Sequence, residues 1–166
     1  MRLITRGRAG TGAYLAAILV VLADQATKYV LEATVPLHES IPVIGGFFSV
    51  THVRNPGAAF GILAGAPESL RFGLLLIVTL AVMVVVIVCL ERHRDAGRAL
   101  TAGLTLILGG AAGNLIDRVS YGEVIDFLDF HVAAWHWPAF NVADAAVTIG
   151  ALLLIIDLFR SRRPSA

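Results

Sequence analysis

The sequence predicts an all-α integral membrane protein of four transmembrane helices, with a small extracytoplasmic β-rich platform in the first outer loop. The first observation is composition: 57% of the 166 residues are hydrophobic, 15% are charged, and mean hydropathy is +0.80. Soluble domains are typically about 45–50% apolar and about 25% charged. The second observation is four apolar stretches, 12–31, 70–90, 99–116 and 140–159. Each approaches the roughly 20 residues that a helix needs to cross about 30 Å of hydrocarbon.

The third observation is that arginines gather at alternate ends of these stretches. Three precede the first, three lie between the second and third, and three follow the fourth: Arg2, Arg6, Arg8, Arg92, Arg94, Arg98, Arg160, Arg162 and Arg163. The positive-inside rule then predicts that both termini are cytoplasmic and that the loops 32–69 and 117–139 face outward. We interpret these arginines as topology anchors in membrane lipid, and we expect no nucleic-acid partner.

The four stretches account for most of the chain, so we expect one membrane domain over residues 1–166. No low-complexity tract, repeat or long hydrophilic linker suggests a second domain. The first stretch could instead be a cleaved signal peptide, with a site near Ala23. Because 22–31 continues a helical pattern and removal would disturb the charge alternation, we predict a retained helix. The single cysteine, Cys89, cannot form an internal disulfide.

Within that domain, residues 38–62 form a predicted β and re-entrant subregion. The segment 41–53 is rich in β-branched and aromatic residues and contains a glycine pair, which favours a hairpin or small sheet on the membrane surface. The segment 55–61 combines turn residues with small ones, which favours a re-entrant return to the bundle. Such a platform could hold an extended peptide by strand addition, or serve only as a structural lid.

Polar residues from three helices fall at one predicted depth, the outer side of the membrane. Asp24 and Lys28 are spaced i, i+4 and can neutralise each other on one helix face. Asn114 shares a face with Asp117, and Asn141 with Asp144, each pair at i, i+3. Such residues can simply join helices, and Gly109-x-x-x-Gly113 is a known packing pattern. Convergence of the whole set at one level favours a functional site.

Two further features concern chemistry. Asp126 lies in the loop stretch 122–130, and Asp144 lies at the entrance of the last apolar stretch. Carboxylates at the edge of hydrocarbon are costly and usually mark a pathway or reaction centre. Two that lie close cannot both ionise easily, so they can share a proton and activate water without a metal. This pattern points towards a peptidase at a membrane surface.

No other catalytic constellation is recognisable in the sequence, and we expect no metal and no cofactor. The outward histidines lack ligand spacing and are interpreted as solvated loop residues. They are His38, His52, His131 and His136.

Five sequence blocks, in order, resemble those of bacterial lipoprotein signal peptidase, also called signal peptidase II. The blocks are Asp24-Gln-Ala-Thr-Lys28, Asn55-Pro-Gly-Ala-Ala-Phe60, Gly109-Gly-Ala-Ala-Gly-Asn-Leu-Ile-Asp-Arg118, Val124-Ile-Asp-Phe127 and Phe140-Asn-Val-Ala-Asp144. Each block is weak alone, but five in order are a strong signal.

The resemblance implies an intramembrane aspartic endopeptidase of the bacterial cytoplasmic membrane, with its active site near the outer face. Its substrates would be prolipoproteins, cut before a diacylglyceryl-modified cysteine. Asp126 and Asp144 match the catalytic dyad, and the choice of Asp126 over Asp117 and Asp129 rests mainly on this match. The residues that match the lining or support of the site are Asn55, Asn114, Arg118, Asn141, Asp24 and Lys28. Asp117, beside Arg118, is expected to be held ionised by that charge.

A small transporter or proton-coupled channel is the competing class, since membrane acids near cations also serve proton relays. The sequence contains no inverted repeat and no polar line through the inner half of the bundle, which argues against it. A structural assembly subunit has no positive feature in the sequence.

Overall fold

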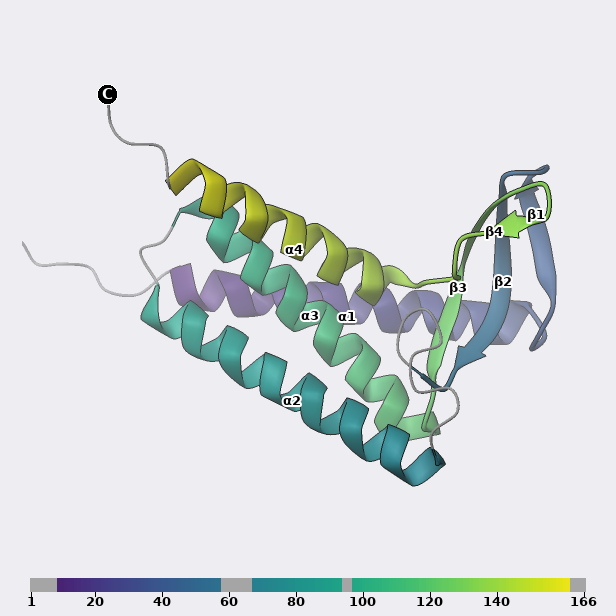
Figure 1. The fold of residues 1–166 in the computed structure, drawn as a ribbon, viewed down its shortest axis with the longest axis horizontal. Helices are drawn as coiled ribbons and strands as arrows, with labels where there is room; N and C mark the ends of the chain where they lie inside the picture. Colours follow the sequence, from purple (N-terminus) through teal and green to yellow (C-terminus); the bar gives the residue numbers. More distant parts are fainter. Residues whose placement is uncertain (1–8, 58–66, 94–96, 162–166) are drawn as a thin grey trace, which may run out of the picture.

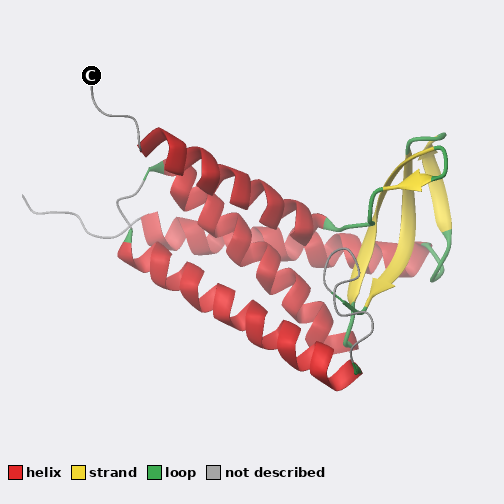
Figure 2. Ribbon diagram, in the orientation of Figure 1, coloured by secondary structure: helices red, strands yellow, loops and turns green. Residues whose placement is uncertain are grey.

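The computed structural model describes residues 9–57, 67–93 and 97–161 and consists of a helical bundle with an antiparallel sheet at one end (Figures 1 and 2). The helices are α1 (Ala9–Thr34), α2 (Glu68–Arg92), α3 (Arg98–Tyr121) and α4 (Val142–Ser161). All four are long and apolar enough to cross a membrane. The four predicted spans therefore correspond to these helices. Helices α1, α2 and α3 are longer than their apolar stretches, whereas α4 has the length of its stretch and begins and ends two residues later.

Helix α3 is the centre of the bundle and packs against α1, α2 and α4 (Figure 1). Small residues allow these close crossings. A Cβ on Gly103 would lie 2.8 Å from the Gly150 carbonyl oxygen, and one on Gly150 would lie 2.7 Å from the Gly103 carbonyl oxygen. At the other crossing, a Cβ on Gly109 would lie 2.8 Å from the Ala17 carbonyl oxygen of α1. The pattern Gly109-x-x-x-Gly113 thus serves helix packing, as the sequence suggested.

The sheet has four strands in the order β1-β2-β3-β4 and lies at the end of the bundle where α1 ends and α4 begins (Figure 1). The strands are β1 (Ser40–Ile44), β2 (Phe48–Asn55), β3 (Val124–Val132) and β4 (Trp135–His136). The predicted hairpin in the first outer loop is confirmed as β1 and β2. The remainder of the re-entrant segment, from residue 58 on, lies outside the described residues.

The sheet extends beyond the first outer loop, because the stretch around Asp126 is strand β3 and not a loop. Its first four residues are buried on both faces, so the sequence lacks the alternation that usually reveals a strand. Ile125 and Phe127 pack with Leu31 and Val35 of α1 and its C-terminal end. This packing fixes the sheet on the bundle.

A β-bulge interrupts the pairing of β2 with β3. The register changes from Val50 opposite Leu128 to Val53 opposite Asp126, so β2 contains one extra residue. Bulges bend a strand and redirect side chains, and they are common beside functional sites. Here the bulge places Asn55 two residues beyond the partner of Asp126, on the same face of the sheet.

Candidate active site

The structure brings Asp126 and Asp144 to one site, although they come from different kinds of element. Asp126 is on β3, with 2% of its surface exposed, and Asp144 is in the first turn of α4. Two backbone hydrogen bonds tie these elements together, because the amides of Phe127 and Leu128 donate to the Phe140 carbonyl, at 3.0 and 2.8 Å. The short connection to α4 is thereby held against β3.

Asn141 contacts both carboxyl groups. Its Nδ2 donates to Asp126 Oδ1 at 2.7 Å, and its Oδ1 accepts a hydrogen bond from the Asp144 backbone amide at 2.8 Å. The Asn141 backbone amide also donates to Asp144 Oδ2 at 3.3 Å. The residue is fully buried, and its partners fix which amide atom is oxygen and which is nitrogen. Asn141 is therefore a rigid bridge between the two aspartates.

Each carboxyl has a second amide donor. Asn55 Nδ2 donates to Asp126 Oδ2 at 3.1 Å, and Asn55 Oδ1 accepts from the Gly57 backbone amide at 3.0 Å. Asn114 Nδ2 donates to Asp144 Oδ1 at 2.7 Å. Three asparagines, from β2, α3 and the residue before α4, thus orient the pair of acids.

Burial, together with the neighbouring charge of Asp144, raises the pKa of Asp126 from an ordinary value of 3.8 to about 7. The hydrogen bonds from Asn55 and Asn141 act in the opposite direction, because they stabilise the ionised form. Such a pair can hold one proton between its two members near neutral pH. It can therefore supply an acid and a base at the same time.

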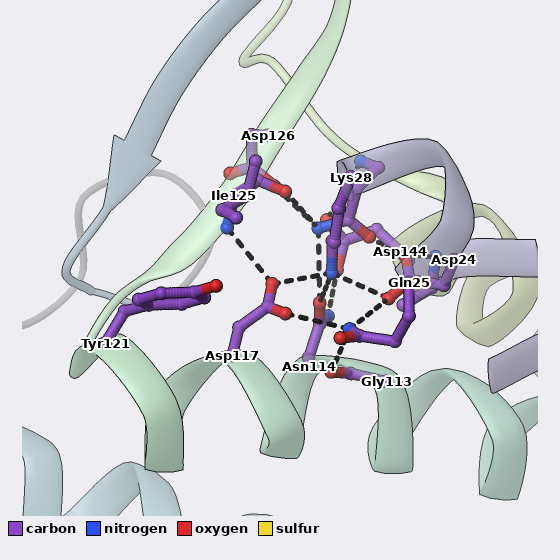
Figure 3. A network of polar contacts seen from close by, with 12 residues as sticks. Asp24, Gln25, Lys28, Gly113, Asn114, Asp117, Tyr121, Ile125, Asp126 and Asp144 are labelled. Carbon is purple, nitrogen blue, oxygen red and sulfur yellow. Dashed lines mark hydrogen bonds and ion pairs between the residues drawn. The ribbon is translucent and has the colours of Figure 1, made fainter. Parts of the chain in front are cut away.

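A buried charged network lies directly beneath this pair (Figure 3). The predicted pairing of Lys28 with Asp24 is confirmed, at 2.7 Å, and Lys28 Nζ also lies 2.7 Å from Asp117 Oδ2 and 3.1 Å from Asn114 Oδ1. Lys28, Asp24 and Asp117 are at most 2% exposed. An ammonium with several oxygen partners compensates much of the cost of burying these charges.

Asp117 has a part that the sequence reasoning missed. The sequence predicted an interaction of Asp117 with the adjacent Arg118, whose charge it does attract, but not its ion pair with Lys28 at 2.7 Å. Its Oδ2 also accepts the backbone amide of Ile125 at 3.1 Å, one residue before Asp126. The charged network therefore holds β3 as well as the helices. The only feature of the sequence that indicated this role was the i, i+3 spacing, which places Asp117 on the same helix face as Asn114.

Gln25, a polar residue at the same depth as Asp24 and Lys28, was not among the predicted site residues. Its Nε2 donates to Asp117 Oδ1 at 2.9 Å and to the Gly113 carbonyl at 3.2 Å (Figure 3). Its place beside Asp24 in the first sequence block was the only hint. The Asp24 carboxylate in turn accepts the backbone amide of Ala143 at 2.9 Å, which ties α1 to the start of α4.

Both aspartates line a groove of about 540 Å³. Arg118, Asn114 and Asn55 contribute polar walls, and the groove continues along α4 past Thr148 and Ile149, which are exposed. All eight residues predicted for the site therefore contribute to the groove or to the network beneath it. One end of the groove is polar and the other is apolar.

One of the four outward histidines, His52, differs from the prediction of solvated loop residues, whereas His38 and His136 are exposed. His52 is only 5% exposed, and its Nδ1 lies 2.8 Å from the Val35 carbonyl oxygen, so it is a packed residue rather than a solvated one. Of the other outward histidines, His136 is exposed and pairs with Asp129 at 2.9 Å. Among the described residues, no group of three or more histidines, cysteines and acids is arranged to hold a metal.

The fold and the site define a polytopic membrane protein with a buried pair of carboxyl groups at one end of its bundle. Residues 16–160 match the model of the family described as Signal peptidase (SPase) II. The chain belongs to this family. Membership makes it a membrane-embedded peptidase of lipoprotein processing.

Curated relatives agree over most of the chain. A lipoprotein signal peptidase of Syntrophus aciditrophicus (strain SB) is 48% identical over 87% of this chain and 90% of its own length. One from Paraburkholderia phymatum is 50% identical, covering 89% of this chain and 87% of that protein. A solved structure, described as a bacterial membrane enzyme determined by the in meso method, is similar with a TM-score of 0.82 and 33% identity. It covers 94% of each chain.

Proposed function

We propose that this protein is an aspartic endopeptidase that removes the signal peptide of prolipoproteins before a diacylglyceryl-modified cysteine. Asp126 and Asp144 are its catalytic pair. The observation that carries the proposal is the Asn141 bridge, which contacts both carboxyl groups beside an open groove. Membership of the family supplies the class of substrate.

The two carboxyl groups divide the chemistry between them. One is ionised and takes a proton from a water molecule as that water attacks the scissile carbonyl. The other is protonated, polarises the carbonyl oxygen through a hydrogen bond, and then gives its proton to the leaving amine. Because the pKa of Asp126 is raised to about 7, one shared proton is available near neutral pH.

The groove offers different surroundings to the two parts of such a substrate. Asn55, Asn114 and Arg118 provide hydrogen-bond donors for the peptide around the scissile bond. The apolar continuation along α4 would leave acyl chains in contact with hydrocarbon. In this proposal the site faces the outer side of the bacterial inner membrane. This orientation agrees with the positions of Arg92, Arg98 and Arg160, at the ends of α2, α3 and α4 that lie away from the sheet.

Purified variants acting on a diacylglyceryl-modified prolipoprotein test the proposal. We expect Asp126→Asn and Asp144→Asn each to reduce turnover by about a thousandfold or more, since an amide can neither accept nor donate the required proton. Asp129→Asn is the matched control, because Asp129 lies three residues along the same strand and pairs with His136 instead. Near-normal turnover of either dyad variant, with a folded protein, would remove that residue from the mechanism.

A further inference from the structure

A second cluster of polar side chains lies outside the dyad and joins three elements. Arg54 of β2 donates through Nη2 to Glu32 Oε1 of α1 at 2.9 Å. Its guanidinium carbon lies 4.6 Å from the centre of the Tyr121 ring, at the last residue of α3. Tyr121 Oη lies 3.5 Å from Glu32 Oε2, which closes the arrangement. We call these three residues the Arg54 clamp.

The clamp is adjacent in sequence to a residue that supports the dyad. Arg54 stands opposite Ile125 in the β2–β3 pairing, and Asn55 follows it directly. Neighbouring residues on a strand point to opposite faces. Arg54 therefore turns towards α1 and α3, whereas Asn55 turns towards Asp126 and donates to its carboxylate at 3.1 Å.

The position of β2 decides whether that hydrogen bond forms. The Asn55 amide cannot rotate freely, because its oxygen is held by the Gly57 backbone amide at 3.0 Å. Asn55 lies at the last position of β2, where pairing with β3 ends at Val124. The tether to α1 and α3 at this end of the strand comes from the clamp.

An exposed ion pair usually contributes little to stability. This pair differs in three respects. The Arg54 and Glu32 side chains are only 28% and 26% exposed, and the guanidinium also lies against an aromatic ring, which adds a cation–π attraction. In addition, Arg54 Nε is buried and has no hydrogen-bond partner among the described residues, so the guanidinium is seated among packed atoms.

We propose that Arg54 is a positioning residue, which through Glu32 and Tyr121 holds the end of β2 so that the Asn55 amide stays on Asp126. This inference rests on the proposed role of Asp126. It assigns a part in the site to a side chain that touches neither the two aspartates nor the network beneath them.

The pKa of Asp126 provides a way to test whether the clamp holds Asn55 in place. The Asn55 hydrogen bond favours the ionised carboxylate, so its loss should raise the pKa of Asp126. The charged groups facing Asp126 are Asp144 of α4, Lys28 of α1 and Arg118 of α3. None of the three is altered by a substitution at position 54.

The experiment compares Arg54→Ala, Arg54→Lys and Asn55→Ala with the unmodified protein in detergent. We measure kcat/KM against pH on a diacylglyceryl-modified prolipoprotein, and the thermal midpoint against pH without substrate. Arg54→Ala should lower kcat/KM at pH 6 by about tenfold, because Asp126 loses an orienting hydrogen bond, and should raise the midpoint that Asp126 sets in both pH profiles by about half a unit to one unit, in the same direction as Asn55→Ala. Arg54→Lys retains the charge and should restore part of the loss. Glu39→Gln, which alters an exposed acid beside β1, is the control.

Two results would overturn the clamp. One is an Arg54→Ala variant whose pH profiles, of activity and of stability, keep the unmodified midpoint. The other is additivity of Arg54→Ala and Asn55→Ala, since two substitutions that break the same hydrogen bond should not add. The thermal midpoint against pH is measured without substrate, so it tests the clamp independently of the proposed peptidase activity. If Asp126→Asn retained peptidase activity, the dyad would fail, yet the midpoint in the stability profile would still show whether Arg54 controls Asp126.

Discussion

At the scale of single residues, the site depends on asparagines that orient acids. A carboxylate can rotate and accept from many directions, so an isolated acid pair is poorly defined. Asn55, Asn114 and Asn141 remove that freedom, because each has its amide oxygen occupied and its amide nitrogen directed at a carboxylate. Preorganised groups need little rearrangement when the reaction begins.

The raised pKa of Asp126 predicts a pH-dependent stability. Its pKa in the folded protein is about 7, above the ordinary value of 3.8, so folding favours the protonated form. The stabilisation is complete below about pH 4 and is lost as the pH rises through about 7. The shift corresponds to at most about 4 kcal/mol of unfolding free energy.

Asp126→Asn removes this dependence, so its thermal midpoint in detergent should change less between pH 4 and 7 than that of the unmodified protein. Asp129→Asn should retain the unmodified profile. Equal slopes for the unmodified protein and Asp126→Asn would show that Asp126 does not bind a proton in this range.

At the same scale, the sequence identified the site residues but not all of their partners. The eight candidates followed from the order of five sequence blocks and from helical spacing. The contact of Asp117 with Lys28 joins residues of two helices, and no spacing rule specifies which faces of two helices meet. The burial of His52 depends on the distant Val35 carbonyl for the same reason.

At the scale of elements, the spans were predictable, whereas β3 was not. A membrane helix satisfies its own backbone hydrogen bonds, so length and hydropathy are sufficient to reveal it. Strand β3 pairs with β2, which lies far away in the sequence, and its first four residues are buried on both faces. A local pattern cannot distinguish such a segment from an apolar loop.

The crossing of α3 and α4 gives a prediction at this scale. Gly150→Ala would place a Cβ 2.7 Å from the Gly103 carbonyl oxygen, and the backbone must shift to accommodate it. We expect a loss of about 1–3 kcal/mol in stability and a loss of activity, since α4 carries Asp144. The lowered thermal midpoint in detergent measures the effect.

Gly73→Ala is the matched control, because a Cβ on this glycine of α2 meets nothing within 4 Å. Alanine is a better helix former, so Gly73→Ala should be neutral or slightly stabilising. If the Gly150→Ala and Gly73→Ala proteins had equal thermal midpoints, α3 and α4 would not be in close contact at Gly103 and Gly150.

At the scale of the whole molecule, the two ends of the helical bundle differ in structure. The sheet lies at the end of the bundle where α1 ends and α4 begins, whereas α2 ends and α3 begins at the opposite end (Figure 1). Asp126 of β3 and Asp144 in the first turn of α4 place the dyad and its groove at the sheet end. Six of the nine clustered arginines lie outside the described residues, so the charge asymmetry is a property of the sequence. They are Arg2, Arg6, Arg8, Arg94, Arg162 and Arg163.

Thiol labelling in intact cells measures the orientation. In a Cys89→Ser background, single cysteines at Glu39 and Ala134, both exposed on the sheet side, should react with an impermeant reagent once the outer barrier is permeable. Cysteines at His93 and Gly97, exposed at the opposite end, should be protected until the cells are lysed. The reverse pattern would place the groove on the cytoplasmic side.

The network around Lys28 has a consequence for biogenesis. Helix α1 is synthesised first and carries Asp24 and Lys28, and each charge is unfavourable in hydrocarbon by about 2.5–3.5 kcal/mol on insertion scales. Asp24 and Lys28 can pair at once, but Asn114 follows Lys28 by 86 positions, and Asp117 comes still later. Until α3 is made, Lys28 lacks its partners Asn114 and Asp117, so we expect α1 alone to be less stable in the membrane than in the complete bundle. Helices α3 and α4, which are synthesised later, thus have two effects. Helix α4 completes the catalytic pair with Asp144, and α3 supplies the partners that stabilise Lys28 of α1 in the membrane.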